Sequence, residues 1–217
     1  MVLYGDSHAL MWFDAMNDIA KAAHWKLVIL GKGYCMWSKY PPDASAAGGP
    51  ILSTCVEWQR FAVRHIRRID PELVVLVEGT QQAPGGKAYT LAQWRQNART
   101  ALEQIERPNT HLVVLGDIPN IYPDDQSPPD CLARNSTDVQ ACSASRTSYL
   151  DPYNRVEAQT AAEVGGRYID VTPWFCAKRC SVIIGQYQVY LDAIHINTAY
   201  SIFLEGVLSE QVNLAHL

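Results

Sequence analysis

A serine near the start of the chain and an aspartate and a histidine near its end are residue types suited to nucleophilic catalysis. Ser7 follows Gly-Asp, and Asp192 precedes His195 by three residues. A serine hydroxyl attacks once a histidine removes its proton, and a carboxylate behind that histidine orients the ring and stabilises its cation. The order Ser7, Asp192, His195 therefore predicts a catalytic triad that joins the two ends of the chain.

The residues around Ser7 predict a strand-to-helix turn. Val-Leu-Tyr at 2–4 is typical of a buried strand, and an apolar-periodic helical segment covers 8–23. A hydroxyl at that turn lies at the carboxyl end of a parallel strand, where open α/β sheets bind ligands. The N–H groups of the helix N-terminus suit a developing oxyanion. The alternative is that Asp6 or Ser7 only caps the helix.

Further apolar runs alternate with helical patterns along the rest of the chain. Strands are expected at 25–30, 73–79, 111–116 and 167–171, and helices at 53–69, 90–106, 152–164 and 199–212. The segment 117–149 is rich in Pro, Ser and Asp and is expected to be a long irregular loop that covers the substrate side. A length of 217 residues with 48% hydrophobic residues indicates one domain, 1–217.

Two motifs resemble the first and last motif blocks of the SGNH (GDSL) hydrolase superfamily: Gly-Asp-Ser at 5–7 and Asp-x-x-His at 192–195. The resemblance implies a flavodoxin-like three-layer α/β/α sandwich with a five-stranded parallel sheet. It also implies acyl-ester chemistry at Ser7, with His195 as the base and Asp192 behind it. No metal and no organic cofactor is required for this chemistry.

The same resemblance implies three donors for the oxyanion. One is the backbone N–H of Ser7, and another is a glycine, for which Gly33 is the candidate and Gly31 the rival. The third block of the family is Gly-x-Asn-Asp, and here Gln81 stands at the position of the asparagine. Glutamine also carries an amide donor. Gln81 is therefore either the third donor or an ordinary loop residue.

Three further features narrow the resemblance. They are Gly-Asp-Ser-His-Ala at 5–9, Gly-Asp-Ile-Pro at 116–119 before a cysteine-containing segment, and a cysteine couple just before Tyr-x-Asp-x-x-His-x-Asn at 190–197. Together they resemble the extracytoplasmic SGNH domain fused to bacterial membrane acyltransferase-3 proteins. The implied partners are an acylated or acceptor glycan or glycolipid and the membrane acyltransferase domain of the same polypeptide. Because the chain begins on its first strand, we expect it to be one domain of a longer protein.

Six cysteines fall into three local couples, which are Cys35 with Cys55, Cys131 with Cys142, and Cys176 with Cys180. Local closure into disulfides is the simplest pairing, although reduced thiols and a zinc site are the alternatives. Disulfides would indicate an oxidising, extracytoplasmic compartment.

The charge balance argues against a nucleic-acid partner. The net charge is −4, and the densest basic run, at 64–68, is expected on the solvated side and end of a helix. No apolar run approaches the roughly 20 residues of a membrane-spanning helix.

Three residues are candidates for substrate binding. His8 neighbours the nucleophile, and Trp174 and Tyr190 could line a carbohydrate-binding cleft; the alternative for each is packing. The sequence therefore predicts an O-acyl, in particular O-acetyl, esterase or transferase that acts on a cell-envelope glycan or glycolipid. A non-catalytic glycan-binding or docking module is the alternative, and a cytosolic lipase-like hydrolase is a third.

Overall fold

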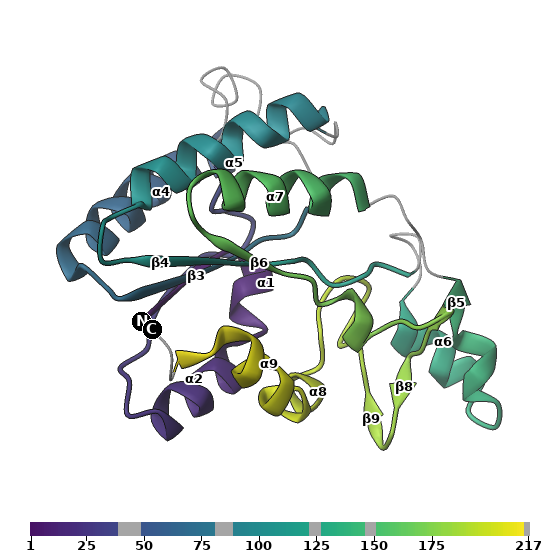
Figure 1. The fold of residues 1–217 in the computed structure, drawn as a ribbon. Coiled ribbons are helices and arrows are strands. Elements are labelled where there is room, and N and C mark those ends of the chain that lie inside the picture. The colour runs from purple at the N-terminus through teal and green to yellow at the C-terminus, as the bar shows by residue number, and fades with distance from the viewer. Residues whose placement is uncertain (39–48, 81–88, 122–126, 146–150, 215–217) are drawn as a thin grey trace.

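The structure is a computed structural model that describes residues 1–38, 49–80, 89–121, 127–145 and 151–214. Five strands form one parallel sheet in the order β2-β1-β3-β4-β6 (Figure 1). The strand bounds are Val2–Gly5 for β1, Val28–Gly31 for β2, Leu73–Val77 for β3, His111–Leu115 for β4 and Arg167–Ile169 for β6. The expected five-stranded parallel sheet is confirmed.

Helices cover both faces of the sheet and complete a three-layer α/β/α sandwich (Figure 1). One face carries α4 (Gly49–Ile69), α5 (Leu91–Ile105) and α7 (Asp151–Glu163). The other face carries α1 (Ser7–Leu10), α2 (Phe13–Ala22), α8 (Thr198–Phe203) and α9 (Glu205–Val212). This is the flavodoxin-like arrangement that the sequence predicts.

The central strands are apolar throughout because helices cover both of their faces. Side chains alternate along a strand, so Leu3 packs in the core beneath α2, α8 and α9, whereas Val2 and Tyr4 pack in the core beneath α4 and α5. All five residues of β3 are completely buried. The sheet is therefore a rigid platform for whatever its carboxyl edge carries.

The helix expected over 8–23 is divided in the structure. α1 ends at Leu10, and α2 starts anew after Trp12. The Trp12 indole is completely buried and meets the rings of Trp174 and Phe175 edge-on. We attribute the break to this packing, because the sequence periodicity alone favours one continuous helix.

The segment expected to be an irregular loop contains regular structure in its described part. α6 (Pro128–Arg134) is capped by the Ser127 side chain, and the 3-10 helix η1 (Val139–Cys142) and β5 (Ala144–Ser145) follow. A disulfide holds α6 to η1. The segment is therefore ordered by a helix cap and a covalent link, which a Pro- and Ser-rich composition does not reveal.

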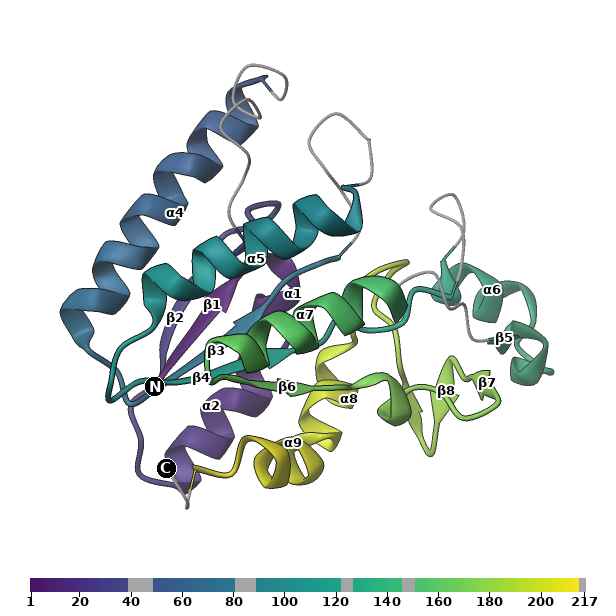
Figure 2. The same ribbon diagram turned by 45° about the horizontal axis from the view of Figure 1, so that its top comes forward.

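This segment meets the chain that follows β6. β5 pairs antiparallel with β7 (Arg179–Cys180), while β8 (Ile183–Ile184) and β9 (Tyr187–Gln188) form a hairpin after the short helix η2 (Thr172–Trp174). Figures 1 and 2 show these pieces as a side lobe beyond the carboxyl ends of β4 and β6. The side lobe thus extends the sandwich at the same edge of the sheet.

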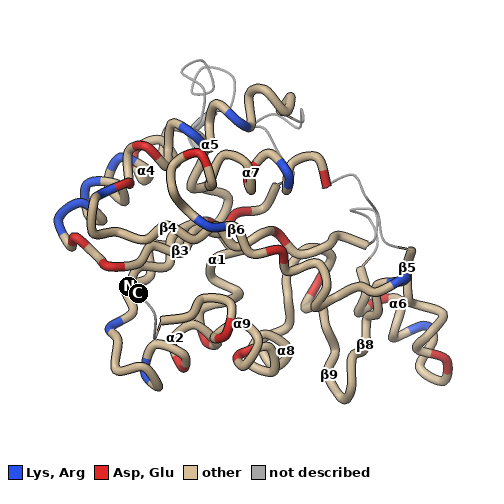
Figure 3. The backbone as a smooth tube through the Cα atoms, in the orientation of Figure 1, with Lys and Arg blue, Asp and Glu red and all other residues tan. Residues whose placement is uncertain are grey.

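The densest basic run lies at the end of α4, as expected. Arg64, Arg67 and Arg68 are exposed there, and Figure 3 shows basic residues gathered at this end of the helix. This end of α4 leads into the start of β3, so the basic run lies at the amino ends of the strands.

Candidate active site

Ser7 lies at the point where the strand order reverses. The chain passes from β1 to β2 on one side and then returns to β3 on the other, which is where open α/β sheets bind ligands. Gly5 ends β1, and a Cβ atom there would lie 1.7 Å from the carbonyl oxygen of Val77 in β3. Only glycine permits this close approach of the two strands, so Gly5 sets the place of the turn.

The carboxylate of Asp6 shapes the turn. It accepts hydrogen bonds from the backbone N–H groups of His8 at 2.8 Å and Gly79 at 3.1 Å. Asp6 is therefore the residue that caps α1, and it also ties the ends of β1 and β3 together. Burial is the main cause that raises the pKa of Asp6, against the nearby His8 charge and these hydrogen bonds. With Asp6 as the cap, the Ser7 hydroxyl is left for another contact.

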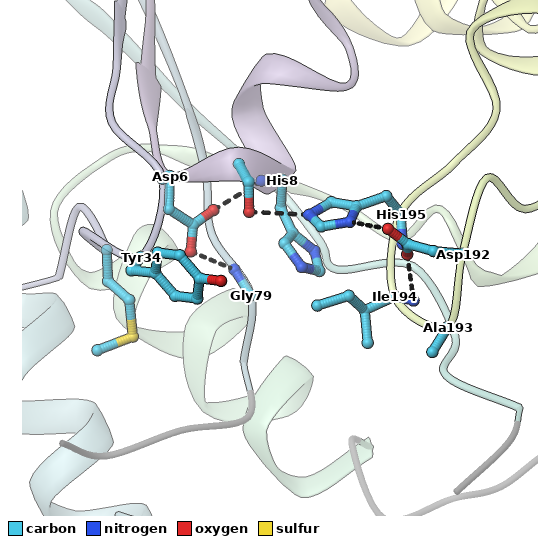
Figure 4. Close-up of a pocket in the computed structure, with 11 residues that line it drawn as sticks. Asp6, His8, Tyr34, Gly79, Asp192, Ala193, Ile194 and His195 are labelled. Carbon is cyan, nitrogen blue, oxygen red and sulfur yellow. Dashed lines mark hydrogen bonds and ion pairs between the residues drawn. The ribbon is translucent and has the colours of Figure 1, made fainter. Parts of the chain in front are cut away.

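The Ser7 hydroxyl contacts His195, and Figure 4 shows His195 paired in turn with Asp192. Ser7 Oγ lies 2.9 Å from His195 Nε2, and His195 Nδ1 lies 2.7 Å from Asp192 Oδ2. Both distances lie in the range expected between a nucleophile, its base and an orienting carboxylate. The fold thus brings together three residues that the sequence singled out, although 188 positions separate Ser7 from His195.

Asp192 and His195 belong to a tight loop before α8. The second Asp192 oxygen accepts the backbone N–H groups of Ile194 and His195, each at 2.8 Å, and a bridge between Tyr190 and Ile196 closes the loop. Partial burial acts to raise the pKa of Asp192, but the hydrogen bonds from the His195 ring and the two N–H groups lower the pKa below its ordinary value. Asp192 is therefore an ionised carboxylate at neutral pH.

A cavity of about 550 Å³ opens beside the Ser7 hydroxyl. Its lining combines polar residues, among them Ser7, His8 and His195, with apolar side chains, among them Tyr34, Met36 and Ile194. This volume lies in the range of small-molecule sites, and the mixture of apolar walls with a few convergent polar groups is characteristic of them. The site can therefore hold a short acyl chain together with part of the alcohol that carries it.

The apolar rim of the cavity is held by a disulfide. Tyr34 is 85% exposed and has a φ of 66°, a conformation that aromatic residues rarely adopt. The next residue, Cys35, is bonded to Cys55 in α4. The other expected couples, Cys131–Cys142 and Cys176–Cys180, are also disulfides in the structure, so the predicted pairing is confirmed.

His8 lines the same cavity and is paired with a buried carboxylate. Its Nδ1 lies 2.6 Å from Asp117 Oδ1, and its side chain is only 8% exposed. Burial alone would lower the pKa of His8, but the charge and hydrogen bond of Asp117, with the charges of Asp6 and Asp192, raise the pKa to about 9. His8 is therefore an imidazolium at neutral pH. The structure places it beside Ser7 in the lining of the cavity, and its role in substrate binding stays a prediction.

The predicted oxyanion donors do not all lie at the cavity in the described part of the chain. Gly33 lines the cavity, whereas its rival Gly31 lies in β2 against the Leu10 side chain. Gln81 lies outside the described residues. Ser7 is the first residue of α1, so its N–H group belongs to the free N-terminal edge of the helix.

Trp174 and Tyr190 do not reach the cavity. The Tyr190 side chain is completely buried in the core, where its hydroxyl donates to the carbonyl of Pro119 at 3.1 Å. Trp174 packs edge-on against Trp12. The prediction that these two residues line a carbohydrate cleft is wrong for this cavity, because both rings are engaged in packing beneath the loop that carries His195.

Sequence reasoning missed Asp117, Gly79 and Tyr34. Asp117 follows β4 at the carboxyl edge of the sheet, just as Asp6 follows β1. A titratable residue directly after a central parallel strand is the signal that would have identified Asp117. Tyr34 gave no such signal, because the loop that presents it is shaped by a disulfide and by contacts far along the chain. The described part of the side lobe contributes no residue to the lining of the cavity, so the expected lid is not found there.

The described residues contain neither a metal-binding cluster nor a membrane-spanning helix. Among the residues that the structure describes, no three His, Cys, Asp or Glu side chains lie close enough together to hold a metal ion. None of the helices in the described part combines the length and apolar character needed to cross a membrane.

Solved structures share the fold. The periplasmic domain of a lipopolysaccharide acetyltransferase from Salmonella Paratyphi A matches with a TM-score of 0.75 at 13% identity, over 98% of this chain and 82% of that chain. A lipase/acylhydrolase from Enterococcus faecalis matches with a TM-score of 0.57 at 14% identity, over 97% and 93%. An acetyl-xylooligosaccharide esterase from Geobacillus matches with a TM-score of 0.54 at 12% identity, over 94% and 81%.

Sequence comparisons give the family. A comparison with curated proteins finds no match. The family model of the SGNH domain fused to AT3 domains matches residues 1–210, which is nearly the whole chain and includes both ends of the Ser7–His195–Asp192 arrangement. The chain therefore belongs to the family of SGNH domains that are fused to AT3 domains.

Proposed function

We propose that this domain is a serine-dependent O-acyl esterase or O-acyltransferase that works through an acyl-serine at Ser7. The observation that carries the proposal is the continuous chain of hydrogen bonds from Ser7 Oγ to His195 and from His195 to the ionised Asp192, beside an open cavity. A serine paired with a histidine in this way is a nucleophile with its base in place.

The reaction begins when Ser7 Oγ attacks the carbonyl carbon of an ester and His195 Nε2 takes the hydroxyl proton. Asp192 stabilises the imidazolium that forms and keeps Nδ1 protonated. The tetrahedral intermediate collapses as its C–O bond to the alcohol breaks and His195 returns the proton to that alcohol. A water molecule or a sugar hydroxyl then repeats the sequence on the acyl-serine. Water makes the domain an esterase, and a sugar hydroxyl makes it a transferase.

The oxyanion donors belong to the proposal. The N–H of Ser7 lies at the free N-terminal edge of α1, and Gly33 lines the cavity. Gln81 is the third donor that the family pattern suggests. A well-placed donor contributes about 3 kcal/mol to transition-state stabilisation.

The substrate is proposed to be an O-acyl group, in particular O-acetyl, on a cell-envelope glycan or glycolipid. Fusion to AT3 domains in the family and the shared fold of a lipopolysaccharide acetyltransferase domain support this class. The three disulfides and that periplasmic relative support an extracytoplasmic location. A membrane acyltransferase domain of the same polypeptide is the proposed partner and tether.

The test is hydrolysis of p-nitrophenyl acetate by the domain beside its Ser7→Ala and His195→Ala variants, with intact mass after fluorophosphonate treatment. Ser209→Ala, which changes an exposed serine on α9, is the matched control. We expect turnover and one adduct in the starting protein and the control, and neither in the Ser7 variant. Residual hydrolysis in the His195 variant should be at least 10³-fold slower.

Equal hydrolysis by the Ser7 variant would place the chemistry elsewhere and refute the acyl-serine. Absence of both turnover and adduct in the starting protein would refute the proposal and leave a glycan-binding or docking module of the membrane acyltransferase.

A further inference from the structure

We propose that His8 is a catalytic residue whose Nε2–H binds the carbonyl oxygen of the acyl group as that oxygen becomes an oxyanion. This inference rests on the proposed acyl-serine function and assigns a role to a second imidazole of the same site. Its basis is the geometry of three residues around the His8 ring.

The first observation is how His8 is held. Asp117 is completely buried, and its Oδ1 faces His8 Nδ1 at 2.6 Å while accepting the N–H of Ile118 at 2.8 Å. Its Oδ2 accepts both the N–H of Thr80 at 2.9 Å and the Thr80 hydroxyl at 3.1 Å. Four hydrogen bonds therefore fix this carboxylate. Because Nδ1 is committed to Asp117, Asp117 positions the ring and leaves only Nε2 for the cavity.

The second observation is where Nε2 lies. A Cβ atom on Gly79 would be 3.0 Å from His8 Nε2, so any side chain at position 79 would crowd this nitrogen and push the ring by a few tenths of an ångström. Gly79 lines the same cavity as Ser7. In the described part of the chain, no residue accepts a hydrogen bond from His8 Nε2. A buried ring with one nitrogen saturated and the other open to a reactive cavity has the form of a ligand-binding donor.

The third observation is the relation of His8 to the base. The two imidazole centroids lie 5.2 Å apart with their planes inclined by 51°. Figure 4 shows the His8 ring between His195 and Gly79, on the cavity side of the site. His195 is hydrogen-bonded to Ser7 and so acts from one side of the reacting carbonyl. His8 is then available on another side, where the oxygen rather than the hydroxyl proton needs a partner.

The charge state of His8 selects this role over that of a second base. Nε2 is a donor only when the ring is cationic, because Nδ1 already donates to Asp117. The groups that face the ring are Asp117 after β4, Asp6 after β1, and Asp192 and His195 in the loop before α8. The three carboxylates raise the pKa of His8 to about 9 against the effect of burial. A ring that is cationic at neutral pH and donates toward a developing negative charge stabilises that charge strongly in a poorly hydrated site.

The step balances without a further reactant. As Ser7 Oγ bonds to the carbonyl carbon, the π electron pair moves to the carbonyl oxygen, and the Ser7 proton goes to His195. His8 keeps its own proton throughout and only donates a hydrogen bond to that oxygen. When the intermediate collapses, the electron pair returns, and His195 protonates the departing alcohol.

The experiment compares kcat and KM for p-nitrophenyl acetate, from pH 6 to 10, in the starting protein and three variants. His8→Gln keeps polar bulk but no cation, Gly79→Ala pushes a methyl group against Nε2, and His65→Gln is the control. His65 stacks on Phe61 in α4, away from the cavity. Thermal unfolding of each variant, and its rate of fluorophosphonate labelling, show that the fold and Ser7 are intact.

We expect His8→Gln to lower kcat by about tenfold or more with little change in KM, because the glutamine amide is an uncharged and weaker donor than the imidazolium. Gly79→Ala should lower kcat by about tenfold through the displaced ring. In the starting protein kcat/KM should fall above about pH 9 as His8 loses its proton, and this alkaline fall should vanish in His8→Gln. A purely structural His8 would not change the pH profile in this way.

The inference is overturned if folded, labelled His8→Gln hydrolyses within threefold of the starting protein, or if it keeps the same alkaline fall. Either result leaves the acyl-serine mechanism standing, because that mechanism is tested by the Ser7 and His195 variants alone. Absence of fluorophosphonate labelling in the starting protein would instead refute both the acyl-serine mechanism and the role of His8.

Discussion

The imidazole rings of His8 and His195 lie 5.2 Å apart, and each is paired with a carboxylate of its own. His195 faces Asp192, which is half-exposed, whereas His8 faces Asp117, which is completely buried. Two similar pairs in one cavity thus have different surroundings. The exposed pair is suited to moving a proton, and the buried pair is suited to keeping one.

Replacing Asp192 by asparagine should disable the base without disturbing the fold. The asparagine amide group would still fill the loop, but it cannot stabilise an imidazolium and can turn the ring to the wrong tautomer. We expect kcat/KM for p-nitrophenyl acetate to fall by roughly 10³–10⁴-fold, with unfolding at pH 7 changed little. A decrease of less than tenfold would show that His195 does not depend on this carboxylate.

The His8–Asp117 pair should stabilise the fold most below neutral pH. The pKa of His8 is about 9 in the folded protein and 6.5 for an unperturbed histidine, so the folded state binds the proton more tightly. The stabilisation is complete below about pH 6.5 and is lost as the pH rises through about 9, by at most roughly 3 kcal/mol. Urea unfolding at pH 6.5, 8 and 9.5 should show this decline.

The matched comparison for that decline is His8→Gln, whose free energy of unfolding should change less over the same pH interval. Parallel pH curves for the two proteins would show that His8 is neutral in the folded state.

A buried glutamate in α7 should destabilise the fold as the pH rises. Glu157 is buried behind the site and accepts a hydrogen bond from Trp94 Nε1 at 3.2 Å. Burial first, and then the charge of Asp117, raises the pKa of Glu157 to about 8. Burial and the charge of Glu157 likewise raise the pKa of Glu78. The folded state must therefore hold protons that the unfolded chain releases, and stability falls between about pH 4.5 and 8.

Glu157→Gln keeps the acceptor for Trp94 and removes the proton requirement, so we expect a higher Tm than that of the starting protein at pH 7.5. Each kcal/mol gained should raise Tm by about 2–4 °C. The advantage should disappear at pH 4.5. Glu210→Gln, which changes an exposed glutamate on α9, is the control and should give no such pH dependence. A lower Tm for Glu157→Gln at pH 7.5 would contradict the prediction.

Two disulfides that close loops of comparable length should differ in their effect on catalysis. Cys35–Cys55 spans 20 positions beside the cavity rim, and Cys131–Cys142 spans 11 positions in the side lobe. Replacing either pair by serine should cost about 3 kcal/mol of stability through the freer unfolded chain. Only the first replacement should raise KM, by about three- to tenfold, because it frees the segment that presents Tyr34.

Kinetics at 15 °C, where both double variants should remain folded, would separate the two effects. An equal KM for the two double variants would show that the rim does not contact the substrate.

The sequence predicted the parts of this protein that depend on local pattern. The apolar run 73–77 is a strand because helices cover both its faces, and Ser7 follows β1 just as the pattern predicted. The pairing of each cysteine couple also followed from proximity along the chain. These features are set by residues only a few positions apart, or by short loops.

The features that the sequence did not predict depend on contacts between distant segments. The helix break at Trp12 and the burial of Tyr190 reflect packing under the last loop, and periodicity contains no information about that packing. The pairing of His8 with Asp117 joins positions 109 residues apart and exists only because β1 and β4 end at the same edge of the sheet. The sequence shows that His8 and Asp117 are present, but it does not show that they are partners.

The 188 positions between Ser7 and His195 also bear on how the protein is made. The serine leaves the ribosome first, and at about 5–20 residues per second its base follows roughly 10–40 s later. Until then the hydroxyl has no histidine to activate it. Under the proposed function, synthesis of the loop that carries His195 is therefore the step that allows the chemistry to begin, and a nascent polypeptide that lacks this loop would stay inert toward esters.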